Sequence, residues 1–268
     1  MSQNLNGYFD EIYCTNLDSR PDRWLRVNAR FQEQGVQARR FSAADGDSEE
    51  LVREYDMIRV RLAEAAKSEP KYLKNSCALG CLISGMRIIE DAKRKGHQRI
   101  LLFDDDVLFH RNFDELLSNM NGLPPWKLLY LGCSQHQWDG IQLSDTHLYG
   151  ARHTHGTFAV GIDASVFDEV LSLYSGREQN CDVYLMEIQD RYPQESLVLF
   201  PNLVIADVRE SSIRGRRSQR AHAKKVKWQL ADYELSYSHY VEGIFEALSL
   251  GLIGSVYRWW VGKRRRGR

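Results

Sequence analysis

The feature that most constrains the fold is a helix-patterned segment that passes directly into a short apolar strand. Apolar residues recur at helical spacing from Leu79 to Ala92, and basic residues followed by Gly96 close the segment. Residues 100–103 come next and have the length and composition of a buried strand. Because such pairs recur along the chain, the sequence predicts an α/β fold with a mostly parallel sheet.

Other segments fit the same alternation. Residues 11–17 read as a first strand, and a helix is expected from Pro21, with Val27 and Phe31 on one face and Gly35 at its end. Further strands are expected at residues 36–44, 128–131, 157–162 and 197–200. Residues 48–74 are charged and give no clear pattern.

Three consecutive carboxylates, Asp104, Asp105 and Asp106, follow the strand at residues 100–103. Side chains alternate in an extended chain, so Asp104 and Asp106 are expected on one side and Asp105 on the other. Two carboxylates on one side repel each other unless a cation neutralises them, and oxygen ligands favour Mg²⁺ or Mn²⁺. Since ligands bind at the carboxyl ends of strands in open α/β sheets, the sequence predicts a cation site here. The alternative is a solvated acidic turn.

Charge is unevenly distributed, although 36 basic and 36 acidic residues give a net charge of zero. Residues 1–208 carry 22 basic and 31 acidic residues, whereas residues 209–268 carry 14 and 5. The C-terminal part is therefore expected to meet something anionic: a membrane surface, a phosphorylated substrate, nucleic acid or the acidic part of the same protein. Its basic run at residues 214–227 could close over a diphosphate as a lid.

Residues 244–261 are apolar and end near Trp259 and Trp260, and a basic cluster follows at residues 263–268. Charges and glycines interrupt this segment, so it is a poor transmembrane helix. Paired tryptophans beside basic residues are typical of a segment in the headgroup region of an anionic membrane. A C-terminal helix docked on the core is the alternative.

The cysteines indicate a reducing environment. They are odd in number and scattered through apolar stretches: Cys14, Cys77, Cys81, Cys133 and Cys181. This is not the pattern of a disulfide framework. The N-terminus lacks the charged start and apolar run of a secretory signal. The expected location is cytoplasmic, with peripheral attachment to the inner face of the membrane.

Several short motifs follow one another along the chain. They are YCTNLDSRPDRW at residues 13–24, FSAADG at 41–46, GCLIS at 80–84, FDDDV at 103–107, LYLG at 129–132, GTFAV at 156–160, PNL at 201–203 and SSI at 211–213. Taken in order, these motifs resemble glycosyltransferase family 25, the lipooligosaccharide and procollagen galactosyltransferase group. The resemblance extends over about residues 10–215.

The resemblance implies a single GT-A (Rossmann-like) glycosyltransferase domain at residues 8–215, followed by a basic helical extension at residues 216–268. It implies a hexosyltransferase that uses a nucleotide-sugar donor, most often UDP-galactose or UDP-glucose, and inverts the anomeric carbon. A Mn²⁺ or Mg²⁺ ion would be held by Asp104 and Asp106. The acceptor would be a glycan, a lipid-linked or lipopolysaccharide-type molecule, or a protein; a nucleic-acid partner is not expected.

The resemblance also assigns roles to individual residues. Asp104 would lie near the donor ribose and the metal, and Asp106 would bind the metal that bridges the diphosphate. The residues expected to contact the donor are Asn16, Leu17, Arg20, Arg23, Asp45, Gly46, Ser84, Asp104 and Asp105. Arg20 and Arg23 have the alternative of being surface charges on a helix.

An inverting transfer needs a carboxylate that takes the proton of the acceptor hydroxyl. Asp182 matches a family aspartate and is the first candidate, with a helix N-cap as its alternative. Asp139 and Asp145 are weaker candidates, and Trp138 and Tyr149 could stack on sugars.

Among the histidines, His153, His155 and His222 could contribute to a site. His222 is the candidate third metal ligand, with a surface histidine as the alternative reading. Gly85 departs from the family pattern, which commonly has histidine after the serine that corresponds to Ser84. This departure bears on donor selectivity and on activity.

Two other functions fit parts of the sequence. A haloacid-dehalogenase-type phosphatase would use Asp104 as nucleophile and Asp106 as acid and base, with Mg²⁺ as cofactor. Leu108 stands where that family has threonine or valine, and a long segment precedes the motif. A non-enzymatic module that binds anionic membranes or nucleic acid would rely on residues 209–268. Neither alternative accounts for the ordered N-terminal motifs.

Overall fold

The structure is a computed structural model. It describes residues 4–65, 73–137, 147–211, 213, 215, 217–236, 238–239 and 241. The chain divides into two compact units, residues 1–233 and residues 234–268, and the fold below is that of the first. This unit extends past the expected end at residue 215, because it includes α8 (Gln219–Val226).

The expected membrane-surface segment at residues 244–268 lies outside the described residues. Within the described ranges, no helix combines the length and apolar character needed to cross a bilayer.

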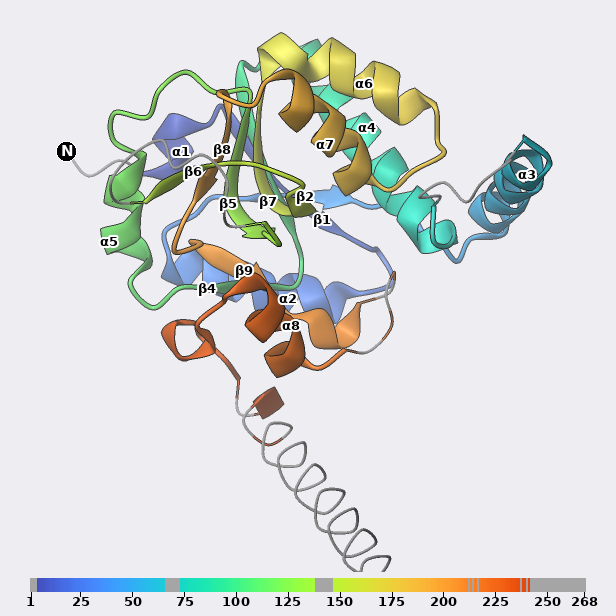
Figure 1. The fold of residues 1–268 in the computed structure, drawn as a ribbon. Helices are drawn as coiled ribbons and strands as arrows, with labels where there is room; N and C mark the ends of the chain where they lie inside the picture. Colours follow the sequence, from blue (N-terminus) through green and yellow to red (C-terminus); the bar gives the residue numbers. More distant parts are fainter. Residues whose placement is uncertain are drawn as a thin grey trace, which may run out of the picture. The chain divides into compact units, whose positions relative to one another are not determined.

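A seven-stranded sheet forms the centre of the unit, in the order β2-β1-β3-β7-β5-β8-β6 (Figure 1). Five strands run in one direction, while β7 and β6 run in the other. The α/β class with a mostly parallel sheet is therefore confirmed. The strands are β1 (Glu11–Asn16), β2 (Arg39–Ser42), β3 (Arg99–Asp104), β5 (Leu128–Ser134), β6 (Leu148–Gly150), β7 (His155–Asp163) and β8 (Ser196–Leu199), and β4 (Val107–Phe109) pairs with β9 (Val204–Ala206) in a small second sheet.

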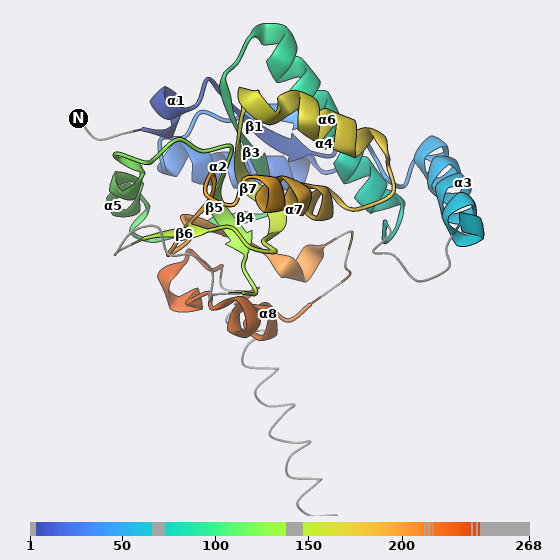
Figure 2. The same cartoon turned by 45° about the horizontal axis from the view of Figure 1, so that its top comes forward.

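Helices cover both faces of the sheet. Figure 2 shows α4, α6 and α7 together on one face, whereas α2 lies on the other. The helices other than α8 are α1 (Leu5–Tyr8), α2 (Pro21–Glu33), α3 (Glu49–Ala65), α4 (Ser76–Lys95), α5 (Phe113–Leu117), α6 (Phe167–Ser175) and α7 (Cys181–Arg191), with 3-10 turns at Ser118–Met120, Ala164–Val166, Val208–Glu210 and Leu230–Asp232. α3 lies in the segment that gave no clear sequence pattern.

The side chains of β3 alternate between the two faces of the sheet and pack into the core on each side. Ile100 and Leu102 belong to the hydrophobic cluster formed with α4, α6 and α7. Phe103 faces the other way and packs against Phe31 of α2, with ring centroids 5.2 Å apart. By this alternation Asp104, the last residue of the strand, emerges on the α4 side.

The predicted stripe on α4 is buried, and both helix ends are capped. Asn75 begins the helix, and its side chain accepts a hydrogen bond from the backbone N–H of Ala78 at 3.0 Å. Gly96 ends it with φ 73°, and its N–H donates to the carbonyls of Ala92 and Lys93. A left-handed glycine at this position is a common helix end, as the sequence predicts.

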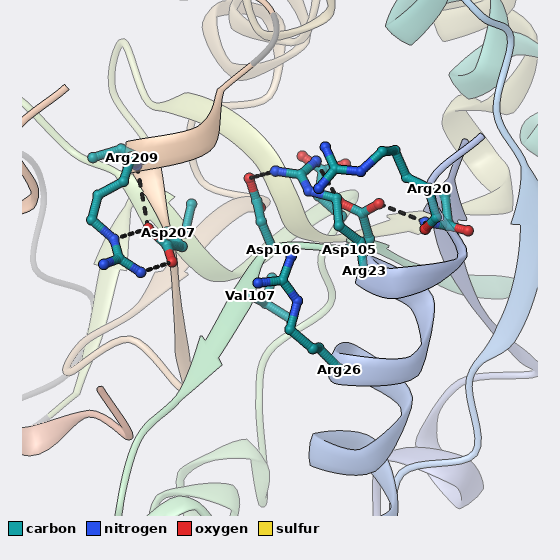
Figure 3. Close-up of polar contacts among 12 residues, drawn as sticks. Arg20, Arg23, Arg26, Asp105, Asp106, Val107, Asp207 and Arg209 are labelled. Atoms are coloured by element: carbon teal, nitrogen blue, oxygen red, sulfur yellow. Dashed lines mark hydrogen bonds and ion pairs between the residues drawn. The ribbon is translucent and has the colours of Figure 1, made fainter. Parts of the chain in front are cut away.

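The turn after β3 is fixed by three side chains from separate elements, Asp105, Arg23 and Asn16, called the turn clamp below. Figure 3 shows Asp105 and Arg23 of this clamp. The Asp105 side chain is 9% exposed and accepts from Arg23 Nη1 at 2.9 Å. Its other oxygen accepts from Asn16 Nδ2 at 2.7 Å. Asn16 also donates to the Arg20 carbonyl at 3.0 Å and accepts from Arg40 Nε at 2.8 Å. The clamp therefore connects β1, β2, α2 and the turn.

The exit of the turn is held from the opposite side. The backbone N–H of Asp207, just after β9, donates to the carbonyl of Asp106 at 2.8 Å. The Asp207 carboxylate is in turn paired with Arg209 Nη2 at 2.7 Å, as Figure 3 shows. Both flanks of Asp106 are thus anchored, so its side chain projects from a rigid backbone.

Removal of Arg23 tests the clamp. We expect Arg23→Gln to lower the free energy of unfolding by about 3 kcal/mol, because it leaves the Asp105 carboxylate buried without a counter-charge. Arg20→Gln is the matched control at the start of the same helix. Arg20 forms an exposed pair with Asp22, so its loss should cost about 1 kcal/mol or less. Urea unfolding measures both variants, and equal losses would contradict the clamp.

Candidate active site

Asp104 and Asp106 line a cavity of about 1120 Å³, including its open mouth, at the carboxyl ends of β1 and β3. Asp104 Oδ1 accepts a hydrogen bond from Thr15 Oγ1 at 3.0 Å. Asp106 Oδ1 is buried and has no hydrogen-bond partner among the described atoms, and Oδ2 lies 3.9 Å from Arg23 Nη2. Within the described ranges, the close ion pair of Arg23 is with Asp105, so the negative charge of Asp104 and Asp106 is less well compensated.

This excess of negative charge alters the proton affinity of both carboxyl groups. Burial, together with the neighbouring charge of Asp105, raises the pKa of Asp104 to about 6. Burial and the charge of Asp104 raise the pKa of Asp106 well above its ordinary value. A divalent cation fits this place, because it would neutralise the pair and give the buried Asp106 oxygen a partner. In the part of the chain that the structure describes, no third acidic, histidine or cysteine side chain completes a metal cluster.

The loop at residues 43–46 forms the opposite wall and lies directly against α4. A Cβ atom on Gly46 would be 2.3 Å from the Cys77 Cα atom, and one on Gly80 would be 2.6 Å from the Ala44 carbonyl oxygen. Glycine at both positions is what permits this approach. The Ala44 N–H donates to Ser84 Oγ at 2.8 Å, and that hydroxyl donates to the Gly80 carbonyl at 2.7 Å.

Most of the residues expected to contact the donor meet in this cavity. Those that line it are Asn16, Leu17, Arg23, Asp45, Gly46, Ser84, Asp104 and Asp105. Arg20 is not among its lining residues and instead pairs with Asp22 on the surface. Arg23 and Asp105 serve the turn clamp, so the structure gives both a structural role beside any contact with a ligand.

Asp182 lines an adjoining cavity, which also has Asp104 and Asp106 in its wall. It lies in the first turn of α7 and is 7% exposed. Its Oδ2 atom is 3.1 Å from His155 Nδ1, and His136 packs edge-on against the His155 ring at 5.4 Å. The predicted base and the predicted cation ligands therefore face connected spaces.

His222 lies in α8 and lines the same adjoining cavity. Its Nε2 atom is 3.0 Å from Ser134 Oγ, and its ring packs against Trp228 with centroids 5.0 Å apart. His222 is 7% exposed, so it is not a surface histidine. Its role as third metal ligand stays a prediction, because the described residues contain no three-ligand cluster with Asp104 and Asp106.

Two residues that line the cavity, Thr15 and Tyr174, are not among the site candidates predicted from the sequence. Thr15 pairs in register with Asp104 across β1 and β3, so only the strand pairing identifies it. Tyr174 of α6 fills the space beside Gly85, where an added Cβ would be 3.1 Å from its ring. A larger side chain at position 85 would require this ring to move.

The weaker candidates for the acceptor site, named from the sequence, do not add to the described site. Asp139, Asp145 and Trp138 lie outside the described residues. Tyr149 lies on β6 with its ring edge-on to Phe200 at 6.0 Å, a packing contact.

Comparisons with known proteins place the sequence in a family. Residues 9–153 match the family described as glycosyltransferase family 25 (LPS biosynthesis protein). A Bos taurus protein named probable inactive glycosyltransferase 25 family member 3 is 25% identical over 70% of this chain. An Anopheles gambiae glycosyltransferase 25 family member is 26% identical over 69% of it, and the human inactive glycosyltransferase 25 family member 3 is 30% identical over 47%.

The matched region spans only part of each relative: 33% of the Bos taurus protein, 32% of the Anopheles gambiae protein and 22% of the human protein. A solved glycosyltransferase involved in the glycosylation of the major capsid of PBCV-1 aligns with a TM-score of 0.42 and 10% identity. That alignment covers 81% of this chain and 96% of the solved one. Since the family match takes in more than half of its residues, the chain belongs to glycosyltransferase family 25.

Proposed function

We propose that the chain is a metal-dependent glycosyltransferase that moves galactose or glucose from a UDP-sugar to a glycan, a lipopolysaccharide-type molecule or a protein, with inversion. The observation that carries this proposal is the pair Asp104 and Asp106, whose charges are poorly compensated and which lie in the wall shared by two cavities. A donor and an acceptor need adjoining spaces, and a cation at their junction would neutralise the charge that develops on a departing diphosphate. Membership of the family supports this function over the phosphatase and binding-module alternatives.

Asp104 and Asp106 would hold the cation, with Thr15 orienting Asp104. Mn²⁺ or Mg²⁺, when bound, would supply Lewis-acid stabilisation of the charge on the departing UDP. Asp105 has a different task, because both of its oxygens are occupied by the turn clamp. Asp104 and Asp106 would bind the cation, and Asp105 fixes the backbone of the turn that carries them.

The donor would occupy the cavity beside the loop at residues 43–46. Leu17, just after β1, would offer backbone groups and Asp45 in the loop a carboxylate to a nucleoside. The Asn16 side chain is held by the turn clamp, so Asn16 shapes the wall and does not offer its amide to the ligand. Ser84 holds the loop against α4, so it positions these groups without needing to touch the ligand. The glycine contacts keep the wall rigid, and a rigid wall lowers the cost of ordering a bound donor.

Asp182 would act as the general base from the adjoining cavity. The acceptor oxygen bonds to the anomeric carbon while the bond to the UDP oxygen breaks, and the acceptor proton moves to the Asp182 carboxylate. His155 orients this carboxylate through its contact at 3.1 Å. Attack from the side opposite the leaving group gives inversion.

The raised pKa of Asp104 predicts how the stability of the metal-free protein depends on pH. The folded state keeps a proton on Asp104 up to its raised pKa of about 6, whereas the unfolded chain releases it near 3.8. This contribution to the free energy of unfolding is therefore present at low pH and is lost as pH rises from about 4 to 6. In chelator, Asp104→Asn should gain stability relative to the wild type across this range in urea unfolding. A stability difference that does not change with pH would be contrary to this expectation.

Asp106→Asn should abolish the response to metal without unfolding the protein, since it removes one of two repelling carboxylates. In the wild type we expect UDP and Mn²⁺ together to raise the melting temperature more than the sum of each alone. The variant should lose this synergy, and sugar transfer should fall about a hundredfold or more. Asp114→Asn, an exposed change on α5, is the control and should behave as the wild type. Full activity in Asp106→Asn would rule out the metal role.

Asp182→Asn should separate binding from chemistry. Binding of UDP with Mn²⁺, measured by calorimetry, should stay near the wild-type level, because Asp182 lines the acceptor side of the junction. Transfer should fall about a hundredfold to ten-thousandfold with loss of the base. Asp190→Asn, an exposed change on the same helix, should leave both unchanged. Transfer at the wild-type rate in Asp182→Asn would remove it as the base.

A further inference from the structure

Two thiols lie at the junction of the cavities and have no part in the proposed transfer. Cys81 belongs to α4 and Cys181 is the first residue of α7. Their Sγ atoms are 3.8 Å apart, and both residues line both cavities. We infer that Cys81 and Cys181 are a redox modification site, which forms a reversible disulfide between α4 and α7 and regulates access to the junction.

The geometry favours this pair over the other cysteines. A disulfide has an S–S distance of about 2.05 Å, so the two sulfur atoms must approach by less than 2 Å, a movement within reach of side-chain rotation and a small helix shift. Cys77 lies one turn before Cys81, but its thiol donates to Asp47 Oδ1 at 3.7 Å. Cys14 and Cys133 are buried in strands of the sheet.

The two thiols differ in exposure, which assigns their order of reaction. Cys81 is half-buried and borders the open cavity, whereas Cys181 is 6% exposed. The hydrogen bond to Cys81 and burial also raise the pKa of the Cys181 thiol, which makes it the poorer first nucleophile. Cys81 is therefore the attacking thiol and Cys181 the resolving thiol.

The oxidant is a low-molecular-weight disulfide of the glutathione class. The Cys81 thiolate attacks one sulfur atom, forms a mixed disulfide and releases one glutathione thiolate. The Cys181 thiolate then attacks Cys81 Sγ, forms the protein disulfide and releases the second thiolate. The two protons lost by the cysteines protonate the two released thiolates. The protein pair loses two electrons, and the glutathione disulfide gains them.

The consequence for the site follows from what adjoins each cysteine, and it rests on the proposed function. Asp182 directly follows Cys181, and Ser84 lies one helical turn after Cys81. A bond between the two sulfur atoms would draw the start of α7 toward the donor wall and narrow the junction. Displacements near 1 Å can lower a catalysed rate about a hundredfold, so we expect the rate of sugar transfer to fall about a hundredfold when the disulfide forms.

Thiol counting tests the disulfide independently of any activity. The full-length protein is reduced, equilibrated in glutathione buffers of increasing oxidised fraction, quenched with acid and assayed under denaturing conditions. The wild type should lose two of its five free thiols, and peptide mass spectrometry should find Cys81 linked to Cys181. Cys181→Ser should instead accumulate glutathione on Cys81, and Cys81→Ser should form no internal disulfide. Cys81→Ala and Cys181→Ala replace the serine variants if those do not fold.

Cys77→Ser is the matched control, because it removes a thiol from the same helix and the same cavity wall. It should form the Cys81–Cys181 link as the wild type does. A wild type that keeps all five thiols, or that links other cysteines, would overturn the inference.

Calorimetry with UDP and Mn²⁺ then separates the two proposals. The reduced wild type should bind UDP with Mn²⁺. The oxidised wild type should bind them at least about tenfold more weakly, and addition of a reductant should restore the affinity. A disulfide that leaves binding and transfer unchanged would overturn regulation of the junction. If the disulfide forms but the reduced protein binds no UDP, the proposed function fails while the modification site stands.

Discussion

The structure depends on the ion pair between Arg23 and Asp105, because it determines how charge is shared in the turn after β3. One guanidinium group lies beside three consecutive carboxylates, and its close contact is with the middle one. That contact fixes the turn against β1 and α2. Among the residues that the structure describes, it leaves Asp104 and Asp106 without an equally close counter-charge at the cavity wall. The order of the turn and the excess of negative charge at its two outer carboxylates therefore have the same origin.

The paired carboxylates of Asp104 and Asp106 lower the stability of the metal-free fold and, in the proposed function, bind a cation. Burial and neighbouring carboxylate charge raise the pKa values of Asp104 and Asp106, and the two ionised groups destabilise the metal-free fold at neutral pH. A protein that needed only a turn here would gain by replacing one of them. Retention of the pair is expected where a ligand supplies the missing positive charge, a common reason for strain at functional sites.

Local pattern in the sequence was enough to predict the α4 stripe and the strands β1, β3, β5, β7 and β8, because periodicity and apolar runs are local properties. It did not predict that β7 runs antiparallel, since alternation carries no direction. α3 was missed because only Leu51, Ile58 and Leu62 are buried along its length. The sequence predicts a cation site at the acidic triplet, and this stays a prediction. The ion-pair partner of Asp105 is 82 residues away, and no spacing rule identifies such a contact. The same holds for His155 beside Asp182.

The most direct test of the central claim is anomalous diffraction from a crystal of the reduced protein grown with UDP and Mn²⁺. The account predicts a manganese peak in contact with carboxylate oxygens of Asp104 and Asp106, with the diphosphate bound to the same ion and Asp105 still paired with Arg23. Manganese and UDP bound at another place in the molecule, or a peak whose ligands exclude both outer carboxylates, would contradict it.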